Sequence, residues 1–333
     1  MDYARALAEL KRSRHVTLTT HVKADSDGLA CIAVLRRWLQ GLGKSVEIVL
    51  PTQPPARYAS LGLDDAVRVA GRDVRAEDVR VPDLLCIVDT GTWQQLSGLE
   101  PLVKACRGRV LVIDHHQTQD DLADVRLVDA EAPAAAVLVH RLLQEAGVRL
   151  DATSASWLLA GLGGDTDWFQ LPNVTAAALR LAADLVEAGA VPWEVYDRLY
   201  RGEPLAKMRL LGMALAGLRP ALGGRAVVMR LTRAMFRDVG TSPVDTEKLI
   251  NECMRVSGVE AAVMLVEAEG DEVRASLRSR PGVDVRRVAE RFGGGGHTRA
   301  AGMRLKGTMD EAETRVLAAL DEALAAADKA EKA

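Results

Sequence analysis

Short apolar runs alternate with longer stretches of helical periodicity through the first half of the chain. The runs expected as buried strands are 16–20, 46–50, 84–88 and 110–113. The stretches expected as helices are 28–40, 134–146, 152–162 and 173–188. Strands that alternate with helices are typical of an α/β fold, because each crossover helix returns the chain to a parallel neighbour. We therefore predict a mainly parallel sheet with helices on both faces.

The pattern changes in the second half, where strands follow one another more closely. Expected strands lie at 226–231, 261–266 and 272–277, and expected helices lie near 246–254 and 285–292. This arrangement predicts a smaller α+β C-terminal domain. The domain boundaries expected from these patterns are a first domain at 1–190, a helical connector at 191–224, a second domain at 225–320 and a C-terminal tail at 321–333.

Net charge and amino-acid composition argue against some classes of nucleic-acid-binding protein. The chain of 333 residues carries a net charge of -3, and only 4% of its residues are aromatic. These values argue against a broad basic surface for long nucleic acid and against extensive base stacking along a strand. The segment 225–306 nevertheless has 15 Lys and Arg against 11 Asp and Glu. This local basic excess is suited to the capture of a small anion.

The four cysteines fit no zinc motif and lie in apolar stretches, so we expect reduced, buried thiols and a cytoplasmic protein. The N-terminal segment has no apolar core of the signal-peptide type. No stretch approaches the roughly 20 apolar residues of a membrane span. A membrane partner is therefore not expected.

Acidic residues and histidines follow three of the expected strands at their carboxyl ends. They are His21, Asp25 and Asp27 after the first strand, Asp89 after 84–88, and Asp114, His115 and His116 after 110–113. In an open parallel sheet, ligands bind beyond the carboxyl ends of the strands, so these groups are expected to face one another. Asp165 is a further candidate, in a loop expected after the helix 152–162.

So many carboxylates in one crevice would repel one another unless cations neutralised them. Mixed His and Asp ligands without Cys favour two manganese ions, with magnesium, cobalt or zinc as alternatives. Two cations suit in-line attack at phosphorus. Each residue also has a plainer interpretation: a lone Asp commonly ends a turn, Asp27 could cap the helix that follows it, and adjacent histidines can belong to a polar loop. Their coincidence at matching strand ends favours the metal site.

Seven short motifs resemble those of a known family. Four of them are His-Val-Lys-Ala-Asp-Ser-Asp-Gly at 21–28, Val-Asp-Thr-Gly at 88–91, Ile-Asp-His-His at 113–116 and Gly-Asp-Thr-Asp-Trp-Phe at 164–169. These resemble the motifs of the DHH phosphoesterases. The others are Ser-Leu-Arg-Ser-Arg at 276–280, Phe-Gly-Gly-Gly-Gly-His at 292–297 and Arg-Ala-Ala-Gly at 299–302. These resemble the DHH-associated C-terminal domain, and the nanoRNase/pAp-phosphatase group is the most similar type.

The resemblance implies a role for each acidic residue and histidine of the first domain. His21 and Asp25 would bind one metal ion, while Asp27, His115 and Asp165 would bind the other. Asp89 would bridge the two ions. Asp114 would orient the cluster, and His116 would contact the scissile phosphate or protonate the leaving oxygen.

In the C-terminal domain the resemblance implies a substrate-binding group. Its members are Arg278, Ser279, Gly294, Gly295, Gly296, His297 and Arg299. Glycine would let backbone N–H groups approach a phosphate, and the cationic side chains would bind it. Composition alone also permits a flexible glycine loop and a solvated Arg278, and Arg299 fits either interpretation equally.

The motifs depart from the family pattern in three places, none of them at an expected metal ligand. Ser26 stands where Gly is common, Cys31 stands where Ser is common, and the third motif continues as Gln-Thr-Gln at 117–119. The expected function is hydrolysis of short RNA or DNA oligonucleotides, 3'-phosphoadenosine 5'-phosphate or linear dinucleotides. A RecJ-type exonuclease and a non-catalytic nucleotide sensor are the alternatives, and the sequence leaves a homodimer open.

Overall fold

The computed structural model describes residues 2–63, 65–106, 108–246 and 248–331. The chain divides into two compact units, Met1–Gly202 and Glu203–Ala333. The division lies inside 191–224, the range expected as a helical connector. Of the helices in that range, α7 (Pro192–Tyr200) belongs to the first unit and α8 (Leu205–Ala216) to the second.

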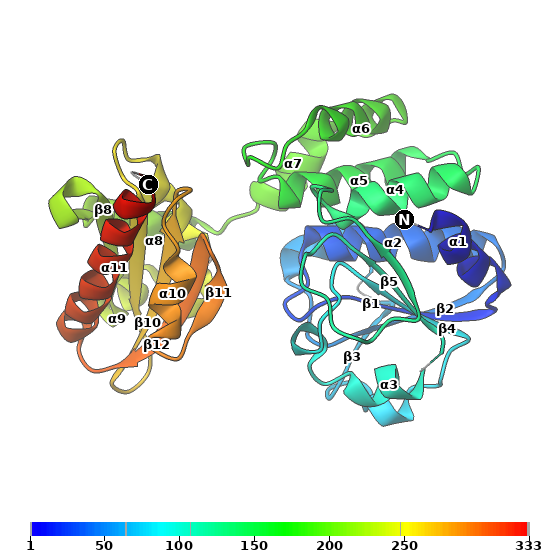
Figure 1. Cartoon of the computed structure of the whole chain (residues 1–333), viewed down its shortest axis with the longest axis horizontal. Helices are drawn as coiled ribbons and strands as arrows, with labels where there is room; N and C mark the ends of the chain where they lie inside the picture. Colours follow the sequence, from blue (N-terminus) through cyan, green and yellow to red (C-terminus); the bar gives the residue numbers. More distant parts are fainter. Residues whose placement is uncertain (1, 64, 107, 247, 332–333) are drawn as a thin grey trace. The chain divides into compact units, whose positions relative to one another are not determined.

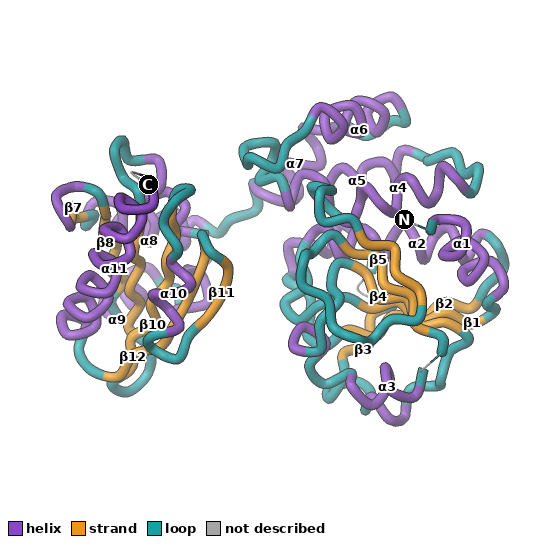
Figure 2. The backbone as a smooth tube through the Cα atoms, in the orientation of Figure 1, coloured by secondary structure: helices purple, strands orange, loops and turns teal. Residues whose placement is uncertain are grey.

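The first unit is built on a six-stranded sheet in which every neighbouring pair is parallel, in the order β3-β2-β1-β4-β5-β6. The strands are β1 (His15–Thr19), β2 (Ser45–Leu50), β3 (Val67–Val69), β4 (Leu84–Val88), β5 (Val110–Asp114) and β6 (Val125–Val128). Figure 2 shows them as one twisted layer inside a shell of helices. The residues of β1, β4 and β5 are all buried, as their continuous apolar runs predict.

Helices cover both faces of this sheet, which confirms the predicted fold class (Figure 1). One face packs against α1 (Tyr3–Arg12), α2 (Ser26–Gly41), α4 (Ala135–Glu145) and α5 (Ala152–Asp165). The other packs against α3 (Glu100–Ala105) and short 3₁₀ helices. The remaining helices, α6 (Ala176–Glu187) and α7, pack against α5.

The strand order has a consequence for ligand binding. From β1 the chain runs outward to β2 and β3, then crosses back to β4, which lies on the other side of β1. The connections leaving the carboxyl ends of β1 and β4 therefore diverge and open a crevice between them. The candidate residues follow these strand ends.

Two features of the first unit differ from the sequence predictions. The short strands β3 and β6 were not expected, because three or four residues carry too little periodicity. Helix α5 also runs to Asp165, so Asp165 is the last residue of a helix and does not lie in a loop beyond it. The prediction ended this helix at residue 162 because Gly163 and Gly164 are poor helix formers. The elements that pack against them keep both glycines in the helix.

The second unit contains a six-stranded mixed sheet in the order β11-β12-β10-β9-β8-β7. The strands are β7 (Arg219–Ala221), β8 (Ala226–Leu231), β9 (Ala261–Glu267), β10 (Glu272–Ser279), β11 (Gly295–His297) and β12 (Ala300–Lys306). Helices α10 (Val285–Glu290) and α11 (Met309–Glu331) cover one face, while α8 and α9 (Arg233–Val239) cover the other. This is the α+β arrangement that the sequence predicts.

Several local predictions for the second unit were wrong. The segment near 246–254 forms the 3₁₀ helices Pro243–Thr246 and Leu249–Arg255 instead of an α-helix. The edge strands β7 and β11 were not expected, because β7 contains Pro220 and β11 is largely glycine. A helix was expected from Met309 onward, and α11 confirms it; Leu324, in the range 321–333 expected as the C-terminal tail, is fully buried in the core of the unit.

Candidate metal centre

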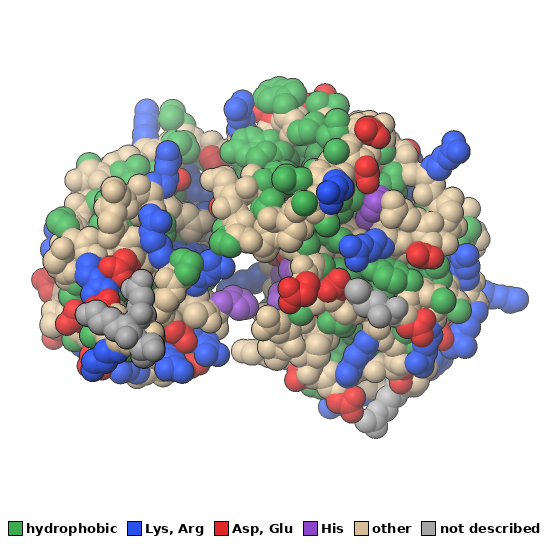
Figure 3. Space-filling view, turned by 45° about the horizontal axis from the view of Figure 1, so that its top comes forward, with side chains coloured by type: hydrophobic (Ala, Val, Ile, Leu, Met, Phe, Trp, Pro, Cys, Tyr) green, Lys and Arg blue, Asp and Glu red, His purple; other side chains and the backbone are tan. Residues whose placement is uncertain are grey.

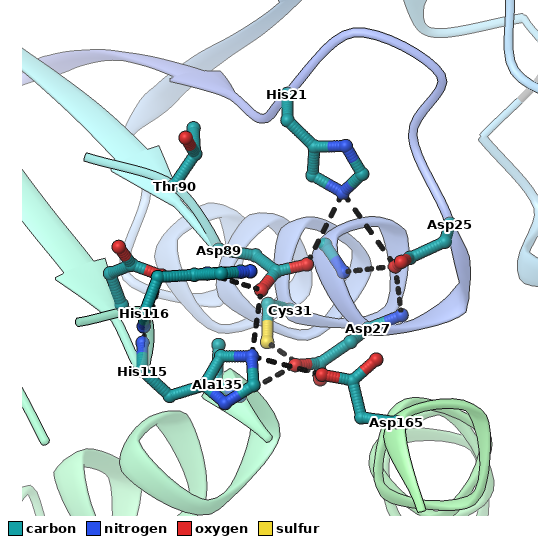
Figure 4. Close-up of polar contacts among 12 residues, drawn as sticks. His21, Asp25, Asp27, Cys31, Asp89, Thr90, His115, His116, Ala135 and Asp165 are labelled. Carbon is teal, nitrogen blue, oxygen red and sulfur yellow. Dashed lines mark hydrogen bonds and ion pairs between the residues drawn. The ribbon is translucent and has the colours of Figure 1, made fainter. Parts of the chain in front are cut away.

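The residues expected as metal ligands come together at the carboxyl end of the parallel sheet (Figure 4). His21 and Asp25 lie between β1 and α2, Asp27 lies in the first turn of α2, Asp89 follows β4, and Asp165 ends α5. His115 and His116 follow β5 directly. Ligand atoms lie within 4.8 Å of one another in three groups: His21, Asp25 and Asp89; Asp27, Asp89, His115 and Asp165; and Asp89, His115 and His116.

Asp89 belongs to all three groups, and its two carboxylate oxygens face different histidines. Oδ2 lies 3.3 Å from His21 Nε2, and Oδ1 lies 3.3 Å from His115 Nε2. The side chain is only 2% exposed, and the backbone at Asp89 is left-handed, with φ of 61°. Left-handed backbone is costly for a residue other than glycine and is typical of functional sites. This conformation places one carboxylate between two clusters of ligands.

Each of the two expected histidine ligands keeps one ring nitrogen occupied by a backbone carbonyl. His21 Nδ1 lies 2.8 Å from the carbonyl of Val22, and His115 Nδ1 lies 3.1 Å from the carbonyl of Ala132. A carbonyl can only accept, so each Nδ1 carries a hydrogen, and in the neutral form of each ring the lone pair is on Nε2. The two Nε2 atoms both point into the cluster, which is the arrangement typical of metal-binding histidines.

The two aspartates at the start of α2 accept hydrogen bonds from different helices. Asp25 caps this helix, because its Oδ1 accepts the backbone N–H of Asp27 at 2.9 Å. The alternative that Asp27 is the cap is therefore wrong. Asp27 is fully buried and instead accepts the N–H groups of Ala135 at 2.5 Å and Ala136 at 3.0 Å, at the start of α4. Its charge thus lies at the positive end of that helix, which has no capping side chain of its own.

A second layer of hydrogen bonds surrounds Asp114, which is fully buried. Its Oδ1 accepts the backbone N–H of His115 at 2.8 Å and the ring Nδ1–H of His116 at 2.8 Å. Its Oδ2 accepts the side-chain amide of Gln119 at 2.5 Å. His116 is thereby held with Nε2 as its free ring nitrogen, and its side chain is 45% exposed. Asp114 and His116 together form a carboxylate–imidazole pair at the open side of the cluster.

Asp165 is positioned by a tight turn after α5. The carbonyl of Asp165 accepts the side-chain amide of Asn173 at 3.0 Å, and the hydroxyl of Thr166 donates to the carbonyl of Leu162 at 2.6 Å. The next three residues, Asp167, Trp168 and Phe169, all have positive φ, from 44° to 66°. Three consecutive left-handed residues without glycine store strain, so this turn is held in place by its surroundings.

Glycines let α5 come close enough for Asp165 to join the cluster. A Cβ at Gly161 would lie 2.7 Å from Asp27 Oδ1 and 3.3 Å from the Cα atom of Asp27. A Cβ at Gly164 would overlap the hydroxyl of Ser26. Both glycines are therefore required by the contact between α5 and α2, and Gly164 lies beyond residue 162, where the helix was expected to end.

The protonation behaviour of the cluster indicates an excess of negative charge. Burial raises the pKa of Asp27 well above its usual range, with the charges of Asp89 and Asp165 adding to the rise. Burial, with the charge of Asp89, also raises the pKa of Asp165 to about 6, although its contact with His115 opposes this. Burial lowers the pKa of His115, but its contacts with Asp165 and Asp89 outweigh burial and raise it to about 12. The isolated cluster therefore retains protons that cations would displace.

Two buried polar atoms show that the residues fit a bound cation. Asp89 Oδ1 and His115 Nε2 are both buried and form no well-directed hydrogen bond among the described residues, although they lie 3.3 Å apart and His115 Nε2 lies 2.9 Å from Asp165 Oδ2. Buried polar atoms without a well-directed hydrogen bond are costly in a folded protein. A divalent cation accepts lone pairs from both carboxylate oxygen and imidazole nitrogen. The cluster can therefore hold metal ions, with donor atoms already directed at a common point.

The substrate-binding residues expected in the second unit lie near one end of its sheet. Arg278 of β10 and His297 of β11 are both paired with Ala300 of β12, so the three form one row across the strands. Arg278 donates to Asn251 Oδ1 at 3.2 Å, and Ser279 donates its hydroxyl hydrogen to the carbonyl of Val283 at 2.6 Å. His297 and Arg299 are exposed.

The glycine run has a structural reason within this unit. A Cβ at Gly294 would lie 2.6 Å from the Cβ of Met303, and a Cβ at Gly296 would lie 2.7 Å from the Cα atom of Ala301. Both glycines let β11 pair with β12, so the run is a turn and a short edge strand instead of a flexible loop. Gly295 lies in β11 and has open space where a Cβ would stand.

Sequence reasoning missed two contributors to the site. The first is Gln119, whose side-chain amide donates a hydrogen bond to Asp114. Its side chain fits there because residue 91 is a glycine, and a Cβ at Gly91 would overlap it. The second is the start of α4, which supplies two N–H groups to Asp27. A signal for the second was present, because Pro133-Ala134 at the start of this helix offers no capping side chain. A helix without its own cap commonly receives one from elsewhere in the fold.

The four cysteines are free and buried, as predicted. Burial raises the pKa of the Cys31 thiol, which lies 3.8 Å from Asp27 Oδ1. In the described part of the chain, no helix has the length and apolar character needed to cross a membrane.

The fold and this cluster define a phosphoesterase of the DHH class. Residues 15–162 match the model of the DHH family N-terminal domain, and residues 223–329 match the model of the DHHA1 domain. The chain belongs to this family. It is 31% identical over 310 residues to the bifunctional oligoribonuclease and PAP phosphatase NrnA of Thermus thermophilus, which covers 93% of this chain and 90% of that relative.

Solved structures give the same fold. An exopolyphosphatase-related protein of Bacteroides fragilis superposes with a TM-score of 0.89 at 22% identity, over 96% of this chain and 95% of the other. A RecJ exonuclease bound to manganese superposes with a TM-score of 0.51 at 18% identity, over 95% of this chain and 93% of the other. Both superpositions cover nearly the whole chain, so the similarity of fold includes the first and the second unit.

Proposed function

We propose that this protein uses two manganese ions to hydrolyse short oligoribonucleotides and 3'-phosphoadenosine 5'-phosphate, releasing nucleoside 5'-monophosphates. The name of the Thermus relative supports both substrate types, since that protein is called an oligoribonuclease and PAP phosphatase. The manganese in the RecJ structure supports the choice of metal. Magnesium and cobalt are the alternative cations for this set of His and Asp ligands.

The observation that carries the proposal is the position of Asp89. One carboxylate whose two oxygens face two separate histidines is suited to bridge two cations. His21 and Asp25 would complete the first metal site, and Asp27, His115 and Asp165 would complete the second. When bound, the cations supply Lewis acidity and neutralise charge at the phosphoryl group that is transferred.

The Asp114–His116 pair has the geometry of a group that acts on the substrate. Asp114 accepts the Nδ1 hydrogen of His116 and so fixes the ring in one orientation. In our proposal the Nε2 atom of His116 contacts the scissile phosphate and delivers a proton to the leaving oxygen. Asp114 favours the charged imidazolium that holds this proton, and it does not take up the proton itself.

In the second unit we propose that the row around Ala300 binds a phosphate or nucleotide remote from the scissile bond. Arg278, Ser279, Gly294, Gly295, Gly296, His297 and Arg299 are the residues of this proposed site. Their common location at one sheet end and the local excess of basic residues support the proposal. Binding of a remote phosphate would lower the entropic cost of reaching the reactive geometry.

The test is a product analysis on the purified chain with manganese present. The substrates are RNA oligomers of two to ten nucleotides, 3'-phosphoadenosine 5'-phosphate, pyrophosphate and a long single strand. We expect nucleoside 5'-monophosphates from the shortest oligomers, AMP and phosphate from 3'-phosphoadenosine 5'-phosphate, and no turnover in excess chelator. Full activity in chelator would rule out the metal mechanism.

The same panel separates the alternatives. Preferential degradation of the long strand would make the protein a RecJ-type exonuclease. Tight nucleotide binding with no products under any metal would make it a nucleotide sensor. His116→Ala should keep the bound metal and lose most turnover, whereas loss of metal from that variant would make His116 a ligand.

A further inference from the structure

Helix α6 lies at the outer edge of the first unit (Figure 1). It has apolar residues on two faces. Ala178, Leu181 and Leu185 form the buried face, where α6 packs against α5. Leu179 and Val186 are on the opposite side and are 53% and 43% exposed. A surface helix normally has charged or polar residues on its outer side, so this second apolar face needs a partner.

The spacing of the outer face is that of a helix–helix contact. Ala176, Leu179, Ala183 and Val186 follow one another at intervals of three, four and three residues. This is the heptad spacing of a coiled-coil seam. The two alanines on this stripe allow the axes of two helices to approach closely. The stripe therefore fits another helix better than it fits a small ligand.

The apolar surface continues beyond both ends of α6. Leu171 before the helix is 41% exposed, and Val191 and Trp193 after it are 43% and 59% exposed. Figure 3 shows hydrophobic side chains gathered at the top of the view, over the part of the first unit where α7 lies in Figure 1. A helix of 12 residues is about 18 Å long. A stable interface buries about 800 Å² per partner, so these flanking residues are needed to reach that size.

The charges beside the stripe indicate which partner covers it. Arg180, Asp184 and Glu187 flank the stripe and are exposed, and none of them forms an ion pair with another described residue. If a second α6 packs antiparallel about an axis near Ala183, Leu179 meets Val186 of the other copy. Arg180 then lies opposite Glu187 of the other copy, and a twofold axis repeats the pair. Parallel packing would place Arg180 against Arg180.

We infer that α6, with Leu171, Val191 and Trp193, is a twofold interface between two copies of this chain. An isologous interface must be complementary to itself, and the reversed charge order of α6 satisfies this condition. The apolar stripe supplies the stabilising contact, and the two Arg180–Glu187 pairs fix the antiparallel register. The interface lies wholly within the first unit.

The first test is the molar mass of the full chain, measured by light scattering during size exclusion. We expect the wild type at twice the chain mass of 35.8 kDa. Leu179→Glu should raise the dimer dissociation constant at least about 100-fold, because the twofold axis places two new charges in the interface. Leu42→Glu is the matched control: Leu42 is 51% exposed, lies in the same unit and should leave the dimer intact.

The second test is a charge exchange. Arg180→Glu alone should weaken the dimer about tenfold, since two exposed ion pairs become repulsive. Arg180→Glu with Glu187→Arg should restore the wild-type mass, which only an antiparallel second copy explains. A monomeric wild type, or a dimer that Leu179→Glu leaves unchanged, would overturn the proposal. A charge exchange that alters folding at constant monomer mass would instead assign the stripe to another part of the same chain.

Discussion

The candidate metal centre of the first unit and the proposed phosphate site of the second differ in whether their polar atoms already form hydrogen bonds. In the candidate metal centre, Asp89 Oδ1 and His115 Nε2 are buried and lie 3.3 Å apart without a well-directed hydrogen bond among the described residues. In the second unit, Arg278 donates to Asn251 and to the carbonyl of Leu277, and Ser279 donates to Val283. His297 and Arg299 are exposed to solvent.

The two proposed sites differ in how far their polar groups are arranged for a ligand before it binds. The first unit buries polar atoms whose hydrogen-bonding capacity is not fully used, so the expected ligand atoms are already directed at a common point. The second unit satisfies its groups internally or leaves them hydrated, so a substrate phosphate must displace a hydrogen bond or water. We therefore expect substitutions in the metal centre to abolish activity and substitutions in the second unit to reduce it.

The largest effect is expected for Asp89→Ala. Among the described residues Asp89 is the only carboxylate in contact with both His21 and His115, so turnover should fall at least about 1,000-fold. Elemental analysis should show less bound metal, while circular dichroism should show an unchanged fold. Near-wild-type turnover in a folded variant would refute the assignment of Asp89 as the bridge.

A smaller effect is expected for Arg278→Ala. Loss of a charged hydrogen bond costs about 1.5–3 kcal/mol, so kcat/KM for a dinucleotide should fall about 10- to 100-fold. Hydrolysis of bis-p-nitrophenyl phosphate, which has no remote phosphate, should change little. Arg304→Ala is the matched control, because Arg304 lies on β12 and is 72% exposed. Equal losses on both substrates would mean that Arg278 supports the fold instead of the substrate.

The sequence predicted the sheet of the first unit well because its main strands are continuous apolar runs. The segment 84–88 is a strand with the bounds that were expected, and the acidic groups follow the strand ends as the topology requires. Periodicity also placed β8 at 226–231. These features follow from local pattern and from one rule about parallel sheets.

The remaining features depend on contacts between distant segments, which local patterns do not contain. Asp165 is helical because Gly161 and Gly164 let α5 pack on α2, although glycine alone predicts the end of a helix. Asp27 accepts a hydrogen bond from the backbone of Ala135 at the start of α4, 108 residues later in the chain. The glycine-rich β11 is a strand only because β12 lies beside it. In each case tertiary packing outweighs local propensity.

A moderate effect is expected for Gln119, which holds Asp114 behind the candidate metal centre. Gln119→Ala removes a hydrogen bond to Asp114 and leaves His116 less firmly held, so kcat should fall about tenfold. KM and bound metal should stay unchanged, because Gln119 contacts none of the expected metal ligands. Gln117→Ala, at an exposed neighbouring position, is the matched control. A loss of metal in Gln119→Ala would show that Asp114 supports the metal site instead of His116.

The smallest effect is expected at the strained turn that follows Asp165. Asp167 has φ of 44°, and no hydrogen bond from its side chain to another described residue is present, so substitutions there test the backbone. Asp167→Gly should change the free energy of unfolding by less than about 1 kcal/mol, because relief of strain is offset by greater freedom of the unfolded chain. Asp167→Val should destabilise the first unit by about 1–2 kcal/mol, because a β-branched residue resists left-handed backbone. Urea unfolding measures both, and kcat for the folded Val variant shows whether the turn also positions Asp165. Equal stability of the Gly and Val variants would mean that this turn relaxes out of the left-handed region, and the metal centre would then depend less on stored strain than its geometry indicates.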